Sequence, residues 1–182
     1  MNLIKTTLDG LVVLKPTIFK DNRGYFMESY NQKNINKLVG NVNFVQDNES
    51  ESSRGVLRGL HFQKPPYAQA KLVRCLKGSV LDVALDLRKD SKTYGCFETT
   101  VLSEENKNQL FIPKGFAHGF VVLSETAIFS YKVDNYYNPD SESGVLWNDL
   151  DLNIDWKINK KEIIVSKKDK SLPTFNNIIN PF

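Results

Sequence analysis

The feature that most constrains the fold of this chain is a two-residue alternation of apolar and polar side chains. In residues 79–87, four leucine and valine side chains fall on one face, while Asp82 and Asp86 fall on the other. Residues 126–133 alternate in the same way, with Tyr131 on the apolar face. A two-residue period places successive side chains on opposite faces of a β-strand, so both segments are predicted to be strands.

Further short segments have strand character and are separated by turn residues. They cover residues 11–14, 25–30, 43–46, 58–63, 71–76, 97–102, 109–112 and 118–123. Two short helices are predicted, at residues 31–38, with Asn31 as N-cap and Gly40 at the end, and at 160–164. The polar residues 47–53 are predicted to be a loop. Many short strands joined by Gly, Pro, Asn and Asp turns indicate an all-β barrel or sandwich.

The composition is that of an ordinary globular protein. The 182 residues suffice for one domain with a substantial core, and 41% of them are hydrophobic and 25% charged. The formal net charge of +3 is too small to indicate a nucleic-acid partner, although it is compatible with a small anionic ligand.

Targeting and redox signals are lacking. No apolar run approaches the length of a transmembrane helix, and residues 1–10 have no apolar signal core. Cys75 and Cys96 show neither metal-binding nor redox spacing, so two reduced thiols are expected. These observations predict a cytoplasmic protein without a membrane partner.

A turn in the second half of the chain carries the second of two histidines. Its sequence, Pro113-Lys114-Gly115-Phe116-Ala117-His118, matches the second half of the cupin signature, in which a turn delivers a histidine into a small β-barrel. Metal-binding cupins also have a His-x-His motif and a glutamate, but here those positions are His61-Phe62-Gln63 and Lys71. A lysine in place of a carboxylate disfavours a divalent metal, and two histidines alone make a poor site. The sequence therefore predicts a cupin-like barrel without a metal site.

The polar residues of such a barrel suit acid–base chemistry. The neutral imidazole of His61 can accept a proton near pH 7, and the ammonium of Lys71 can stabilise an oxyanion. The hydroxyl of Tyr131 can return a proton. Together these groups favour proton abstraction beside a carbonyl, and a stereocentre inverts if the base and the acid approach from opposite faces.

Several motifs in order resemble one family. They are Arg58-Gly59-Leu60-His61-Phe62-Gln63, Lys71-Leu72-Val73-Arg74, Pro113-Lys114-Gly115-Phe116-Ala117-His118-Gly119-Phe120 and Trp147-Asn148-Asp149. Over residues 11–169 the chain resembles the dTDP-4-dehydrorhamnose 3,5-epimerases, and several ordered motifs are far more specific than one. The resemblance implies an all-β fold, a cupin-like jelly-roll barrel with short peripheral helices, as a single domain over residues 1–182.

The resemblance also implies a reaction and the residues that perform it. The reaction is epimerisation at C3 and C5 of dTDP-4-keto-6-deoxyglucose to dTDP-4-keto-L-rhamnose, in dTDP-L-rhamnose biosynthesis. The family's base matches His61, oriented by an aspartate that matches Asp169. Its acid matches Tyr131, and the lysine that stabilises the enolate matches Lys71. No cofactor is implied.

The family's ligand is a dTDP-linked 4-keto-6-deoxyhexose. The contacts to it match Arg23, Phe26, Glu28, Gln46, Asp47, Asn48, Arg58, His118, Glu142 and Lys168, and the ring that stacks on thymine matches Tyr137. The family is a homodimer in which an exchanged N-terminal strand, holding Arg23 and Glu28, reaches into the partner's site. A single barrel would leave the edge of that strand unpaired, which also favours a dimer.

The residues alone leave three structural questions and three alternative functions open. Asp155 could replace Asp169, Tyr136 could replace Tyr137, and only a bulge at Gly59 would let Arg58 and His61 reach one site. The closest rival function is a single-site 3- or 5-epimerase of a related nucleotide sugar. A metal-dependent cupin enzyme and a sugar-binding barrel without catalysis are the other two.

Overall fold

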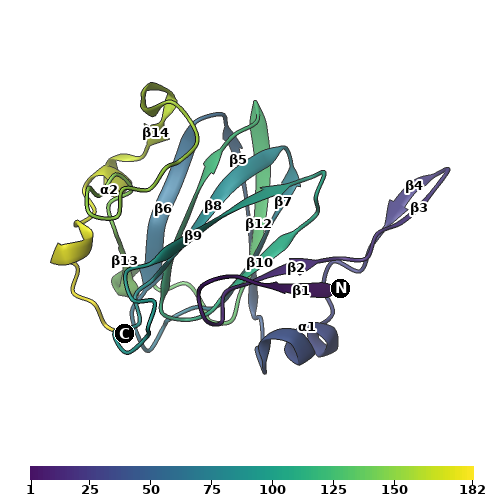
Figure 1. Cartoon of the computed structure of the whole chain (residues 1–182), viewed down its shortest axis with the longest axis horizontal. Helices are drawn as coiled ribbons and strands as arrows, with labels where there is room; N and C mark the ends of the chain where they lie inside the picture. The colour runs from purple at the N-terminus through teal and green to yellow at the C-terminus, as the bar shows by residue number, and fades with distance from the viewer.

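The computed structural model describes residues 1–182 as two β-sheets that face each other (Figure 1). The first sheet has the order β1 (Asn2–Lys5), β2 (Val12–Lys15), β10 (Gln109–Ile112), β7 (Lys71–Lys77), β12 (Thr126–Val133) and β5 (Gln46–Ser53). The second has the order β13 (Glu142–Gly144), β6 (Val56–Gln63), β11 (Phe116–Val122), β8 (Ser79–Asp86) and β9 (Phe97–Ser103), with β14 (Ile164–Val165) paired to β6. The prediction of an all-β fold is confirmed.

The remaining elements are short and lie outside the two sheets. They are the β3 (Phe19–Asp21) and β4 (Gly24–Phe26) hairpin, the helices α1 (Gln32–Val39) and α2 (Lys167–Lys170), and 3-10 turns at Pro139–Ser141, Lys160–Glu162 and Phe175–Asn177. No helix is long and apolar enough to cross a membrane.

Both faces of the second sheet are buried. Val80 and Ala84 of β8 join a core cluster between the sheets, whereas Leu81, Val83 and Leu85 pack under the C-terminal segments, which cover the outer face. The predicted alternation of β8 is therefore correct, but its polar face is not exposed. Asp82 and Asp86 have no accessible surface.

Helix α1 follows its predicted caps. The side chain of Asn31 accepts a hydrogen bond from the amide of Asn34, and Gly40, with φ 89°, ends the helix. Its buried residue Ile35 packs with Leu72 and Phe111 on the outer face of the first sheet. Leu38 and Val39 of the same helix are partly buried and pack against this cluster as well, so three apolar residues anchor α1.

The predicted loop at residues 47–53 is wrong, because residues 46–53 form strand β5. This strand pairs with β12 along its whole length. The sequence concealed it because every residue from Gln46 to Ser53 is polar, so no apolar alternation marks the strand. Backbone pairing rather than side-chain burial defines this strand, and its inner face presents polar groups to the barrel.

Three other predicted elements are shorter than expected. Of the strand predicted at residues 43–46, only Gln46 is in a strand, as the first residue of β5. Of the strand predicted at residues 25–30, only Tyr25 and Phe26 are extended, within β4. Of the helix predicted at 160–164, Lys160–Glu162 form a 3-10 turn, and Ile164 already begins β14. Pairing of β14 with β6 draws this segment into extended structure.

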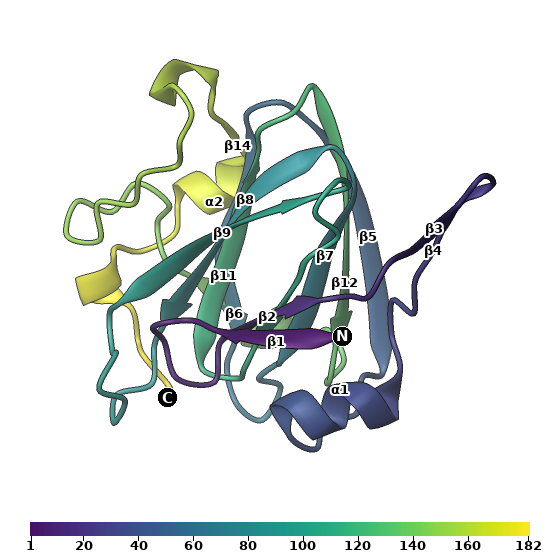
Figure 2. The same cartoon turned by 45° about the vertical axis from the view of Figure 1, so that its right-hand side comes forward.

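The β3–β4 hairpin projects away from the barrel (Figure 2). Three of its aromatic side chains, Phe19, Tyr25 and Phe26, are 61%, 54% and 69% exposed. The hairpin makes no sheet contact with the rest of the chain. Exposed aromatic clusters of this kind mark interaction sites.

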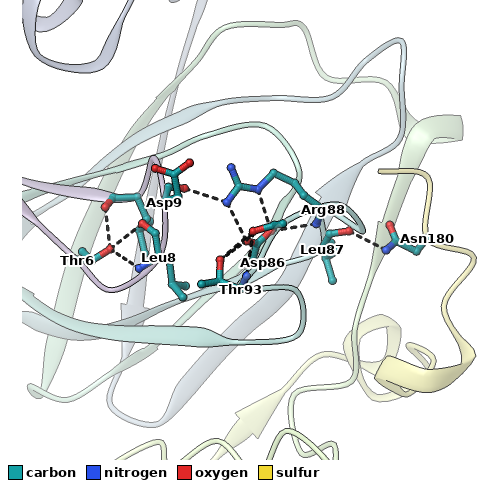
Figure 3. Close-up of polar contacts among 10 residues, drawn as sticks. Thr6, Leu8, Asp9, Asp86, Leu87, Arg88, Thr93 and Asn180 are labelled. Atoms are coloured by element: carbon teal, nitrogen blue, oxygen red, sulfur yellow. Dashed lines mark hydrogen bonds and ion pairs between the residues drawn. The ribbon is translucent and has the colours of Figure 1, made fainter.

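Asp86 and its neighbour Leu87 connect segments that are distant in sequence at one end of the barrel, and the carbonyl of Leu87 accepts a hydrogen bond from Asn180 near the C-terminus (Figure 3). The Asp86 carboxylate accepts hydrogen bonds from Arg88, Ser91 and Thr93 at 2.7–3.0 Å. Arg88 also donates to the carbonyl of Asp9 at 2.9 Å. Burial alone would raise the pKa of Asp86, but these hydrogen bonds outweigh it and lower the pKa to about 2.

Asp86→Asn is expected to reduce the free energy of unfolding by about 3 kcal/mol at pH 7, because Arg88 loses a buried partner. The folded-state pKa of Asp86 lies below the usual 3.8, so its contribution is complete above that pH and is lost as the pH falls toward about 2. The stability gap between wild type and variant should therefore narrow over this range in chemical denaturation curves.

Asp155→Asn is the matched control, because the Asp155 side chain is 69% exposed and pairs only with Lys157. It should change the free energy of unfolding little at any pH. Equal effects of the two substitutions would contradict a structural role for the buried carboxylate.

Candidate active site

A cavity of about 550 Å³ opens between the two sheets. His61, Lys71, His118 and Tyr131 line it, together with Arg58 and Asp169. A second cavity of about 320 Å³ shares His61, Lys71 and Tyr131 and continues past the end of β5. The two cavities form one cleft (hereafter the barrel cleft), with the three shared residues where they meet.

His61 and Asp169 form a hydrogen-bonded pair in the barrel cleft. Nε2 of His61 lies 2.8 Å from Oδ1 of Asp169. The side chain of Asp169 is 5% exposed, and the Ser166 hydroxyl holds its backbone amide at the start of α2. Asp155, the alternative partner, is exposed and pairs with Lys157, so the structure brings Asp169 rather than Asp155 to His61.

The protonation state of this pair follows from its contacts. Burial would raise the pKa of Asp169, but hydrogen bonds from His61 and the amide of Gly59 outweigh it and lower the pKa. An ionised carboxylate only accepts hydrogen bonds, so Nε2 of His61 carries the proton. Nδ1 is left with the lone pair that a base requires.

A bulge at Gly59 turns both Arg58 and His61 toward the barrel cleft. His118 of β11 is opposite His61, but Phe120 is opposite Arg58, so β6 has one more residue than β11 between these pairs. Gly59 has φ 124°, and a Cβ there would lie 2.5 Å from Cα of Gly119. Only glycine fits this approach.

Lys71 and Tyr131 extend from the first sheet toward His61 in the second. Burial lowers the pKa of Lys71 to about 8, against the opposing charges of Asp82 and Glu142. The ammonium forms no hydrogen bond or ion pair within the chain, so its donors are free for a ligand. Burial raises the pKa of Tyr131, which keeps the phenol protonated near neutral pH.

Five of the predicted ligand contacts gather at the rim of the barrel cleft. They are Gln46, Asn48, Tyr137, Glu142 and Lys168. Glu142 accepts hydrogen bonds from the Tyr137 hydroxyl at 2.7 Å and from Lys168 at 2.5 Å. Gln46 contacts both Asn48 and the amide of Tyr137. Tyr137 lines the second cavity whereas Tyr136 does not, so geometry favours Tyr137 as the stacking ring.

Four predicted contacts lie away from the cleft of their own chain. Asp47 points to the opposite face of β5 and pairs with Lys132 at 2.8 Å. Arg23 and Phe26 are on the projecting hairpin, and Glu28 follows it and binds Asn31 and Asn34. One chain therefore does not assemble the whole predicted contact set.

The comparisons with known proteins agree with this geometry. A family model described as dTDP-4-dehydrorhamnose 3,5-epimerase matches residues 5–177. The enzyme of that name from Escherichia coli K12 is 51% identical over 180 residues, which is 98% of this chain and 97% of the relative. This chain belongs to the dTDP-4-dehydrorhamnose 3,5-epimerase family.

Solved structures of the family superpose closely. The crystal structure of dTDP-4-dehydrorhamnose 3,5-epimerase from Elizabethkingia anophelis has a TM-score of 0.95 and 57% identity, covering 99% of this chain and 98% of that chain. The epimerase from Legionella pneumophila in complex with dTDP-4-keto-L-rhamnose has a TM-score of 0.93 and 47% identity, covering 97% and 94%. The cupin-like jelly-roll fold is thereby confirmed.

The donor set of this family member does not fit the metal found in many cupins. Nε2 of His61 and Nε2 of His118 each bind a carboxylate, and Lys71 occupies the position of the glutamate ligand. No group of three or more His, Cys, Asp and Glu side chains could hold a metal ion.

Two residues that hold predicted site residues in place, Ser52 and Asp82, were not predicted from the sequence. The Ser52 hydroxyl accepts from Nε and Nη2 of Arg58 at 3.2 and 3.1 Å, and Asp82 binds His118 at 2.9 Å. Ser52 was hidden because β5 was not recognised. Asp82 carried a signal, since a charged residue in an otherwise apolar buried strand needs a partner.

Gly59→Ala is expected to lower the free energy of unfolding by roughly 3 kcal/mol. The added Cβ would push β6 away from β11, and alanine is strained at the positive φ of this position. Epimerase turnover should fall with it, since Arg58 and His61 depend on the bulge. Thermal denaturation and a turnover assay check both effects.

Gly24→Ala separates the two causes, because Gly24 has φ 128° but no atom within 4 Å of an added Cβ. It should cost only roughly 1 kcal/mol, from backbone strain alone. If Gly59→Ala is no more destabilising, the strands have room to separate and the close approach is not required.

Proposed function

We propose that this chain epimerises C3 and C5 of dTDP-4-keto-6-deoxyglucose, giving dTDP-4-keto-L-rhamnose for dTDP-L-rhamnose biosynthesis. The observation that carries the proposal is the pairing of His61 with Asp169 in a cleft shared with Lys71 and Tyr131. The family's name and the ligand of the Legionella relative support the same substrate.

His61 is the base of the reaction. The C4 ketone acidifies the hydrogens on C3 and C5, and Nδ1 of His61 removes one of them. Asp169 holds the ring by accepting the Nε2 hydrogen and stabilises the imidazolium that forms. Such a positioned base contributes typically about 10²–10⁴-fold to the rate.

Lys71 and Tyr131 complete the inversion. The electron pair of the broken C–H bond moves to the C4 oxygen, where the Lys71 ammonium stabilises the enolate. Tyr131 lies on the sheet opposite His61 and donates its hydroxyl proton to the far face of the same carbon. Solvent then returns a proton to the tyrosinate and takes one from the imidazolium.

The nucleotide is held at the rim of the barrel cleft. Tyr137 stacks on the thymine, while Glu142 and Lys168 fix that ring and contact the ligand. The guanidinium of Arg58 donates to the neutral hydroxyl of Ser52 and has no anionic partner, so its charge remains available for the diphosphate. Gln46, Asn48 and His118 supply the remaining contacts of this chain, whereas Asp47 is paired with Lys132 on the opposite face of β5.

The site is completed by a second copy of the chain. The projecting hairpin carries Arg23 and Phe26, Glu28 follows it, and none of the three lines the cleft of its own barrel. In a homodimer with an exchanged N-terminal strand, they enter the partner's cleft and close it over the nucleotide.

Two free cysteines suit a reducing, cytoplasmic setting, and no cofactor takes part.

Tyr131→Phe is expected to separate proton exchange from inversion when the substrate is followed by NMR in heavy water. The variant keeps the base and Lys71, so deuterium still enters from His61 on the original face. Net epimerisation should fall by about 10²-fold or more, because the far-face donor is gone. The ratio of exchange to inversion therefore rises.

His61→Ala is the control, and it should abolish exchange and inversion together because no enolate forms. In wild type, deuterium should enter both C3 and C5; exchange at one carbon would identify a single-site epimerase, and no exchange would exclude this substrate. Equal losses of exchange and inversion in Tyr131→Phe would show that Tyr131 is not the acid.

A heterodimer of Arg23→Ala and His61→Ala chains, purified through two different tags, tests the exchanged hairpin. One of its two sites combines an intact His61 with an intact Arg23 from the other chain, so about half of the wild-type activity should return. Each variant alone should be nearly inactive as a homodimer.

No recovery in a folded heterodimer would place Arg23 outside the partner's cleft. A monomeric mass by light scattering, with full wild-type activity, would overturn the dimer itself.

A further inference from the structure

Asp82 is a buried carboxylate that the reaction described so far does not use. It lies on the inner face of β8, between Val80 and Ala84, and has no accessible surface. Its Oδ2 is 2.9 Å from Nε2 of His118. Its Oδ1 is buried and has no hydrogen-bond partner. A half-satisfied carboxylate inside a core is costly, so its retention calls for a function.

The other carboxylates around the cleft are hydrogen-bonded or lie at its exposed side. The charged and titratable groups that line the cavities around Lys71 are Arg58 and His61 on β6, Glu49 on β5, His118 on β11, Tyr131 on β12, Tyr137 after it, Glu142 on β13 and Asp169 on α2. Asp82 on β8 is bonded to His118 and lines neither cavity. Glu142 binds Lys168, and Asp169 binds His61. Glu49 is exposed. Among the buried acids here, only Asp82 has a carboxylate oxygen without a hydrogen bond, since both oxygens of Asp169 are bonded.

His118 does not neutralise Asp82. Burial lowers the pKa of His118, against the opposing effect of Asp82, so the ring is neutral at pH 7. A neutral ring that donates from Nε2 satisfies one carboxylate oxygen but leaves the negative charge in place. Lys71, whose ammonium has no ion pair, lines the same cavity as His118, the residue that Asp82 binds.

We propose that Asp82 is a positioning residue of the epimerase reaction: it is the buried counter-charge that keeps Lys71 protonated, and it orients His118. The inference rests on the proposed function, in which the Lys71 ammonium stabilises the enolate. A neutral amine could not do so, and burial drives lysine toward that form. Burial lowers the pKa of Lys71 to about 8, and Asp82 is the largest of the charges that oppose this effect.

Asp82→Asn tests the assignment, because it keeps the shape and a hydrogen-bond acceptor for His118 but removes the charge. The alkaline limb of the pH profile of kcat should move down by about one pH unit or more, because Lys71 loses its proton sooner. Turnover at pH 8 should then fall by roughly 10-fold, while the loss at pH 6.5 is much smaller.

Asp86→Asn is the matched control, since it removes an equally buried acid from the same strand at a distance from the cleft. It should lower thermal stability without moving the alkaline limb. If Asp82→Asn does not fold, an NMR titration of the Lys71 ammonium in wild type replaces it; a pKa near 8 supports the counter-charge, and one below 7 overturns it.

A folded Asp82→Asn enzyme with an unmoved alkaline limb, or with the same loss at every pH, would overturn the role of Asp82. Turnover of the wild-type enzyme in the same assay distinguishes the two proposals. If the wild type shows no turnover, the proposed function fails. If the wild type turns over and the alkaline limb of Asp82→Asn does not move, only the assignment of Asp82 is refuted.

Discussion

The contact between Gly59 and Gly119 is the constraint on which the barrel cleft depends. Backbone of β6 approaches backbone of β11 so closely that a side chain on either glycine would collide with the other strand. The resulting bulge changes the alternation of β6, so that Arg58 and His61 line one cavity and His61 stands opposite His118. A regular strand would send one of the two away.

Charge compensation inside the barrel follows from this arrangement. Both carboxylate oxygens of Asp86 accept hydrogen bonds, and these hydrogen bonds lower its pKa. Asp169 is matched by one histidine, which leaves the other ring nitrogen for chemistry. Asp82 is the least satisfied of the three.

Local patterns predicted the strands that bury side chains, and the failures have a physical cause. β12 could be predicted because apolar and polar residues alternate cleanly, whereas β5 is polar on both faces and exists through its pairing with β12. Contacts between distant residues were beyond any local pattern. His61 and Asp169 are 108 positions apart, so only the ordered motifs of a family indicated that pair. Asp82 was visible as an acid in a buried strand, but nothing nearby in sequence identified His118, 36 positions away, as its partner.

The cleft separates chemistry from recognition in a way that follows from strand position. His61, Lys71 and Tyr131 lie on strands with neighbours on both sides, where pairing and core packing hold them rigidly. Most of the proposed nucleotide contacts lie instead on the edge strands β5 and β13, on the loop after β12, on α2, and on or just after the projecting hairpin, whereas Arg58 and His118 lie on the central strands β6 and β11. Edges, loops and hairpins can change without disturbing the core. The fold can therefore keep the proposed proton-transfer centre while its rim, and in the proposed homodimer a second copy of the chain, determine which nucleotide sugar reaches it.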